Sequence, residues 1–106
     1  MRVLTYKVKG QRLIATGNHS GLIAGTKGYV KALFEFDKDW DGCIKVVSFF
    51  NDGEYAIKLD DSNTCYIPNE ALTNSTFKVK VEGRKQDGYC IFTDPITERQ
   101  KGGVSE

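Results

Sequence analysis

The fold is decided by residues 34–42, FEFDKDWDG. Apolar and polar side chains alternate up to Phe36, which predicts a strand with one buried face. A tight acidic turn then carries Trp40, the single tryptophan of the chain. A tryptophan in such a turn typically folds over the open end of a sandwich and donates its indole N–H to a carbonyl. We therefore expect Trp40, Asp41 and Gly42 to anchor this turn on the core; the alternative is an exposed tryptophan that binds a partner.

Short β-like runs separated by turn signals lie on both sides of this stretch. They cover residues 2–8, 11–16, 29–36, 43–50, 55–59, 64–67, 77–81 and 89–93. One helical turn is expected at 68–72, because proline suits the first helical position. The polar segment 96–103 is expected to add an edge strand, and the last four residues are expected to fray. About eight strands without a long helix predict an all-β fold, an antiparallel β-sandwich or a small barrel.

Length and charge place limits on the class of protein. At 106 residues the chain is expected to form one domain, 1–106, and its net charge is +1. Lys78 and Lys80 alternate with valines, so they belong to the solvent face of a strand rather than to a dense basic patch. Nucleic acid is therefore not expected as a partner. A membrane is not expected either, because no apolar run approaches about 18 residues. We expect no signal peptide, because residues 1–8 lack a long apolar core.

The three cysteines, Cys43, Cys65 and Cys90, are far apart and form no Cys-x-x-Cys pair. This spacing favours reduced thiols in a protein made in the cytoplasm. We expect all three to be buried and to act as small hydrophobic side chains.

An acidic repeat within the opening stretch suggests a metal site. Asp37, Asp39, Asp41 and Gly42 match the start of an EF-hand calcium loop. The match then fails, because the twelfth position is Ser48 instead of a bidentate glutamate and strands flank the loop. We expect no metal site, but a turn whose aspartates accept backbone hydrogen bonds.

The glycine-rich segment 17–28 offers no catalytic signature. Its GTKG sequence lacks the Gly-Lys-Ser/Thr of a phosphate loop, and a strand follows where a helix is needed. His19 is the single histidine, and no cysteine lies in a recognisable nucleophile context with it. We expect no catalytic residues and no cofactor. Long loops in compact domains often make functional contacts, so this loop is expected to touch a neighbouring subunit.

A second motif, CYIPNEAL at residues 65–72, follows the tryptophan turn after an expected hairpin. Together, Phe-Asp-x-x-Trp-Asp-Gly and Ile-Pro-x-Glu-x-Leu resemble a pattern in small β-sandwich virion accessory proteins of tailed phages that infect Gram-positive bacteria. The likeness extends over about residues 29–103 and includes Val81-x-Gly83. It implies an immunoglobulin-like sandwich, with Pro68 and Glu70 as further structural anchors. The sequence departs from the pattern at residues 84–86, where members often have a short neutral turn, and at Glu106, where many members continue into a fibre.

The resemblance implies a non-enzymatic phage structural protein that is located in the virion and is oligomeric there. It would attach to other virion proteins, as a capsid decoration or head-fibre base or as a fibre anchor at the tail or baseplate. Contacts are expected from the loop 17–28 and the polar segment after Pro95, with His19, Lys27, Arg99 and Lys101 as candidate partner-binding residues. The alternative function is a phage-encoded binding module that inhibits a host protein.

Overall fold

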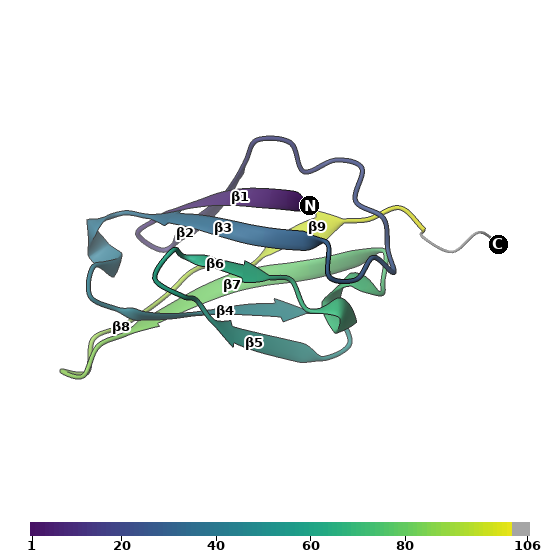
Figure 1. Ribbon diagram of the computed structural model, residues 1–106. Helices are drawn as coiled ribbons and strands as arrows, with labels where there is room; N and C mark the ends of the chain where they lie inside the picture. The colour runs from purple at the N-terminus through teal and green to yellow at the C-terminus, as the bar shows by residue number, and fades with distance from the viewer. Residues whose placement is uncertain (103–106) are drawn as a thin grey trace.

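The computed structural model describes residues 1–102 and contains nine strands in two packed sheets (Figure 1). The expected fraying falls on residues 103–106, outside the described residues. The strands are β1 (Arg2–Lys9), β2 (Arg12–Thr16), β3 (Val30–Phe36), β4 (Ile44–Phe50), β5 (Glu54–Lys58), β6 (Thr64–Tyr66), β7 (Thr76–Arg84), β8 (Cys90–Phe92) and β9 (Ile96–Arg99). Two short 3-10 turns, η1 (Lys38–Trp40) and η2 (Asn69–Leu72), complete the elements.

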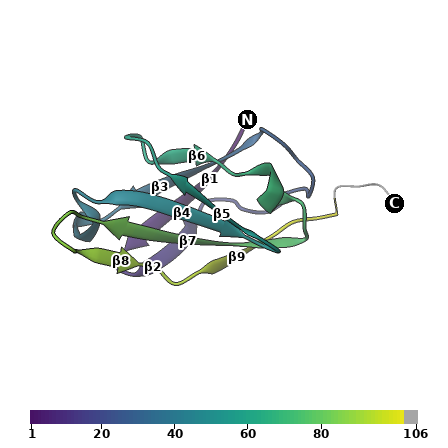
Figure 2. The same cartoon turned by 90° about the horizontal axis from the view of Figure 1, so that it is seen from below.

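The two sheets form the predicted β-sandwich. One sheet has the strand order β2-β1-β3-β6, and the other has the order β5-β4-β7-β8, with β9 also paired to β7. Figure 2 shows β4, β5 and β7 as one layer in front of β1 and β3. The all-β prediction is confirmed, with nine strands where about eight were expected and two helical turns where one was expected.

One strand pair departs from the antiparallel expectation. β1 and β3 run parallel, from Arg2 opposite Val30 to Val8 opposite Phe36. β2 pairs antiparallel with β1, and the long loop 17–28 then carries the chain back to the start of β1. A parallel neighbour requires a long crossover of this kind. The loop therefore lies at the same end of the sandwich as the start of β1 (Figure 1).

Alternating side chains fill the space between the sheets. On β7 the inward residues Phe77, Val79 and Val81 are at most 1% exposed, while Lys78 faces solvent. Three successive residues of β4, Val47, Ser48 and Phe49, are buried, so this part of the strand is covered on both faces. Such burial of apolar side chains supplies the main stabilising free energy of the fold.

An irregularity on the outer edge of β7 sets the direction of the last strand. Between the pairs Glu82–Phe92 and Val79–Ile96, three residues of the edge strand oppose two residues of β7. This is a β-bulge, and it lies next to Pro95, which cannot donate a ladder hydrogen bond. Within the bulge the Thr93 hydroxyl accepts the Val81 N–H at 2.9 Å. The shifted register turns the side chains of Ile96 and Glu98 inward.

Candidate interaction surface

Trp40 closes one end of the sandwich. Its side chain is fully buried, and its indole N–H donates to the Gly10 carbonyl at 2.8 Å. The Gly10 N–H in turn donates to the Asp37 carboxylate at 2.7 Å. The two turns are therefore joined by a reciprocal pair of hydrogen bonds around a buried ring. Both the burial of Trp40 and its carbonyl partner agree with the sequence prediction.

Two glycines shape this region: Gly42 lets the chain turn, and Gly83 leaves room for the indole. Gly42 ends the turn with φ = +77°, a conformation that side chains rarely adopt. Gly83, on β7, lies against the ring: a Cβ atom there would be 2.7 Å from Trp40 Cε3 and 3.2 Å from Cys43 Cβ. Two features of the phage-like pattern, the tryptophan turn and the glycine at the strand end, are thus two halves of one packing contact. We call this region, residues 37–42 with Gly10 and Gly83, the Trp40 end.

The aspartates of this turn do not act alike. Asp37 accepts backbone hydrogen bonds from Gly10 and from Asp39, as expected. The exposed side chain of Asp41 accepts no hydrogen bond within residues 1–102, and its contribution to the turn is a backbone N–H bonded to the Lys38 carbonyl. In the same part of the chain, no three His, Cys, Asp or Glu side chains gather to hold a metal ion.

The second motif forms a turn that is held by a residue outside it. Pro68 precedes η2, and its carbonyl accepts the Ala71 N–H at 3.0 Å. The Glu70 side chain is exposed and forms no hydrogen bond among the described residues, so the expected anchoring role belongs to its backbone. The Asn51 amide, from the β4–β5 turn, donates to the Glu70 and Ala71 carbonyls at 3.0 and 3.1 Å. From the sequence alone, Asn51 is expected only to be part of the turn between two strands.

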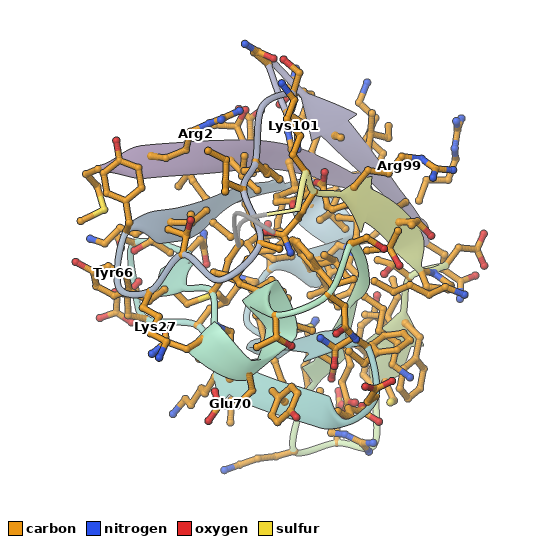
Figure 3. The ribbon with its side chains drawn as sticks, turned by 90° about the vertical axis from the view of Figure 1, so that its right-hand side faces the viewer. Arg2, Lys27, Tyr66, Glu70, Arg99 and Lys101 are labelled. Carbon is orange, nitrogen blue, oxygen red and sulfur yellow. The ribbon has the colours of Figure 1, made fainter. Side chains whose placement is uncertain are left out.

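At the opposite end, the two segments expected to contact partners lie side by side. The Ala24 N–H donates to the Lys101 carbonyl, and the Lys101 N–H donates to the Leu22 carbonyl, both at 2.8 Å. The loop is also bonded to η2, because the Gly25 N–H donates to the Leu72 carbonyl at 2.7 Å. We call this surface, residues 17–29, 69–72 and 100–102, the loop end; Figure 3 views it directly.

Three of the four candidate partner-binding residues are exposed. Lys27 and Lys101 extend from the loop end, and Arg99 lies on β9, on the other side of this view from Lys27 (Figure 3). None of the three forms an ion pair with another described residue. These side chains are therefore available to a partner, with Lys27 and Lys101 on the same loop surface.

His19 differs from the other three because it is turned into the protein. Its side chain is 13% exposed. Nδ1 lies 2.7 Å from the Glu98 carboxylate, and Nε2 lies 2.9 Å from the carbonyl oxygens of Thr5 and Thr16. Both ring nitrogens are thus occupied by internal contacts. This placement does not favour the partner-binding role expected for His19; the ring instead ties the start of the loop to β1 and β9.

Glu98 is the centre of a buried polar cluster that the sequence analysis missed. Its side chain is only 6% exposed, and the same oxygen that faces His19 accepts the Tyr6 hydroxyl hydrogen bond at 2.6 Å. Carbonyl oxygens only accept, so Nε2 is the ring nitrogen of His19 that donates to Thr5 and Thr16. Burial, followed by the charge and hydrogen bond of Glu98, raises the pKa of Tyr6 well above its ordinary value.

The segment after Pro95 therefore belongs to the fold more than the sequence suggested. Its residues 96–99 pair with β7 as β9, and Glu98 and Gln100 are 5% and 8% exposed. The Gln100 N–H also donates to the Ser75 carbonyl at 2.7 Å. The edge strand expected at 96–103 is thus found at Ile96–Arg99, where it pairs with β7.

The cysteines are less buried than expected. Cys43 and Cys65 are half-buried, Cys90 is exposed, and all three are free thiols. Burial, with a smaller contribution from the charge of Asp60, raises the pKa of Cys65 to about 12. The prediction that all three cysteines are buried is wrong.

Comparisons with known proteins add no assignment to this geometry. No protein-family model matches the sequence, and no curated protein matches it. Within residues 1–102, no helix is long and apolar enough to cross a membrane.

Proposed function

We propose that this chain is a non-enzymatic structural protein of a tailed phage that attaches to other virion subunits. The proposal combines the phage-like turn motifs with one structural observation. The two segments chosen from sequence as contacts, the loop 17–28 and the chain near Lys101, form a single surface at one end of the sandwich.

The loop end is suited to binding through its side chains. Backbone hydrogen bonds join the loop to Lys101 and to η2, so the surface is ordered before a partner arrives. Preorganisation of this kind lowers the entropy lost on association. Lys27 and Lys101 then extend from a fixed frame without an ion-pair partner among the described residues.

The buried polar cluster around Glu98 favours the function of a binding protein over that of an enzyme. Tyr6, Glu98 and His19 are close enough for proton transfer, but each is engaged with another protein group. Glu98 is 5% exposed and Tyr6 is 1% exposed, so a substrate has no access to the carboxylate. The cluster joins β1, the loop and β9, which is a structural task.

Mass spectrometry of purified virions tests the proposal. We expect the protein as a stoichiometric component that remains with particles through sedimentation. A protein that is abundant in infected cells but absent from particles would contradict the proposal and favour the host-inhibitor alternative.

A pair of charge variants then tests the surface. Particles that lack the protein are mixed with Lys27→Glu/Lys101→Glu or with the matched control Lys9→Glu/Lys38→Glu, whose exposed lysines lie at the Trp40 end. We expect the first variant to lose attachment and the control to retain it. Equal retention would show that attachment does not use the loop end.

A further inference from the structure

A small pocket opens at the loop end, between the loop and the first residues of β1 and β3. Its volume is about 70 Å³. Buried Leu22 and Val30 form an apolar floor, Ile23 and Tyr29 form the walls, and Arg2 closes one side. Ile23 and Tyr29 are each 51% exposed, so the walls keep apolar surface in contact with water. Burial of that surface by a partner would be favourable.

The pocket is held in shape by hydrogen bonds on both sides. The Arg2 guanidinium donates through Nη2 to the carbonyls of Asn18 and Ser20, at 3.1 and 2.6 Å. The Arg2 backbone N–H donates to the Tyr29 carbonyl at 2.9 Å. On the far side of the loop, the Lys101 backbone forms hydrogen bonds with the backbones of Leu22 and Ala24. A ligand therefore meets a formed site rather than a loop that must first be ordered.

Arg2 is the one charged side chain among the residues that line the pocket; the exposed Glu70 lies on the loop end but outside the pocket. No acidic side chain lines it. Nε and Nη1 of Arg2 have no hydrogen-bond partner among the described residues, and Lys27 and Lys101 lie on the same surface, as Figure 3 shows. A guanidinium with free donors binds carboxylates with well-defined geometry. The basic side chains at and near the pocket therefore favour an acidic ligand.

The size of the pocket limits what can enter it. A cavity that holds benzene has a volume of about 150 Å³, roughly twice the volume here. An aromatic ring is therefore too large, whereas one aliphatic side chain fits the volume. The apolar floor disfavours insertion of the carboxylate itself, which would lose its hydration.

We propose that this pocket receives one aliphatic side chain from an acidic segment of a neighbouring virion subunit, and that Arg2 binds a carboxylate next to that side chain. The inference rests on the proposed function, because it names the chemistry of the partner at the same surface. The aliphatic side chain supplies the anchor, and the carboxylates supply orientation and selectivity.

An NMR titration tests the pocket without the native partner. Isotope-labelled protein is titrated with the acetylated and amidated peptide Glu-Leu-Glu-Glu, and with Lys-Leu-Lys-Lys and Glu-Ala-Glu-Glu as control peptides. We expect Glu-Leu-Glu-Glu to shift the amide signals of Arg2 and of residues 21–30, and to bind more weakly as salt screens the charges. Both control peptides should bind at least about fivefold more weakly, because each lacks one half of the recognition.

Matched variants locate the binding. Tyr29→Ala should weaken the peptide at least about fivefold. Tyr66→Ala should not, although Tyr66 is 47% exposed at the same end of the sandwich. Melting curves of both variants should coincide with that of the parent. The proposal is overturned if the pocket amides do not move, if the basic peptide binds equally well, or if the two variants weaken binding equally.

The two proposals fail in different ways. If the protein is a virion component but the amide signals of the pocket do not shift with the acidic peptide, the pocket assignment is wrong and the proposed function stands. If the peptide binds as expected but virions lack the protein, the pocket stands as a site for an acidic partner and the virion role is wrong.

Discussion

At the Trp40 end, a buried indole fills the gap between the two sheets, whereas at the loop end the gap is covered by segments bonded through their backbones. Trp40 is fully buried; its indole N–H donates to the Gly10 carbonyl, and its ring lies against Gly83. At the loop end, Ile23 and Tyr29 are half exposed, and Lys101 holds the loop through its peptide groups. The Trp40 side chain is used for folding, whereas the loop end has both buried side chains that hold it, such as His19 and Leu22, and exposed side chains that remain available for contacts.

This difference shows how one small sandwich separates stability from binding. Exposed side chains on a surface held largely by backbone bonds tolerate changes, because the frame does not depend on their identity. A buried ring in contact with a glycine tolerates almost none, since interiors are closely packed. Substitutions at the two ends should therefore have opposite effects on folding and on association.

The largest expected effect comes from truncating an aromatic residue at each end. Trp40→Ala removes a ring that is fully buried and should lower the free energy of unfolding by about 4 kcal/mol. Tyr29→Ala, at a residue that is 51% exposed, should lower it by less than about 0.5 kcal/mol. Urea denaturation of both variants measures the contrast. If Trp40→Ala melts like the parent but no longer binds particles, Trp40 is an interface residue and the comparison of the two ends collapses.

A second effect sharpens the description of the loop end. His19→Leu leaves the Glu98 carboxylate buried without its basic partner, 2.7 Å away in the parent. Breaking a buried pair in this way should cost about 3 kcal/mol. Replacing the whole cluster with His19→Leu, Glu98→Met and Tyr6→Phe should recover part of that loss, because no uncompensated charge remains. If the single variant is as stable as the parent, the cluster does not hold the loop.

The third effect tests the contact between the tryptophan turn and β7. Gly83→Ala places a Cβ atom 2.7 Å from Trp40 Cε3, so the indole has to move. Overpacking of this kind should cost about 2 kcal/mol. In a Trp40→Ala background the same substitution should cost much less, because the clashing ring is gone. An additive double-mutant cycle would rule out the direct contact.

Residues that obey a period or fit a motif could be predicted from sequence, and residues that break the period could not. Trp40 and the strand around Val79 follow from turn chemistry and alternation. Glu98 occupies an inward position of β9. From sequence alone, a glutamate in a strand is expected to face solvent unless its partners are known. Those partners, Tyr6 and His19, are 92 and 79 residues away in sequence, so no local pattern indicates the cluster.

The candidate surface could be predicted only in part, for the same reason. The loop 17–28 and the chain near Lys101 were each recognised as lying outside the core pattern, but their pairing depends on the parallel return of β3 beside β1. The bulge next to Pro95 also hides the burial of β9, because it shifts the register by one residue. Such details depend on long-range geometry that a single sequence does not display.

A smaller effect concerns alkaline pH. The pKa of Tyr6 is raised by burial and then by Glu98, so the folded protein keeps this proton at a pH where the unfolded chain, with a tyrosine pKa of about 10, loses it. The free energy of unfolding should therefore fall as pH rises above about 10. Tyr6→Phe should cost about 1 kcal/mol at neutral pH and should flatten this decline. Cys65 contributes in the same direction in both proteins, since its pKa is raised to about 12. A slope unchanged by Tyr6→Phe would assign the decline to other groups.

The smallest expected effect on folding is at the exposed lysines of the loop end. Lys27→Gln/Lys101→Gln removes two charges that form no ion pair among the described residues, so the free energy of unfolding should stay within about 0.5 kcal/mol of the parent. The backbone bonds of Lys101 to Leu22 and Ala24 do not depend on its side chain and should persist, so the hydrogen-exchange protection of the donor amides, those of Ala24 and Lys101, should be unchanged. Association with particles should nevertheless weaken, and the loss should shrink at high salt, because a charge-based contact is screened. The control Lys9→Gln/Lys38→Gln, at the Trp40 end, should leave association unchanged. If the loop-end variant unfolds more easily while attachment is retained, these side chains serve the fold, and the loop end is closed by side chains as the Trp40 end is.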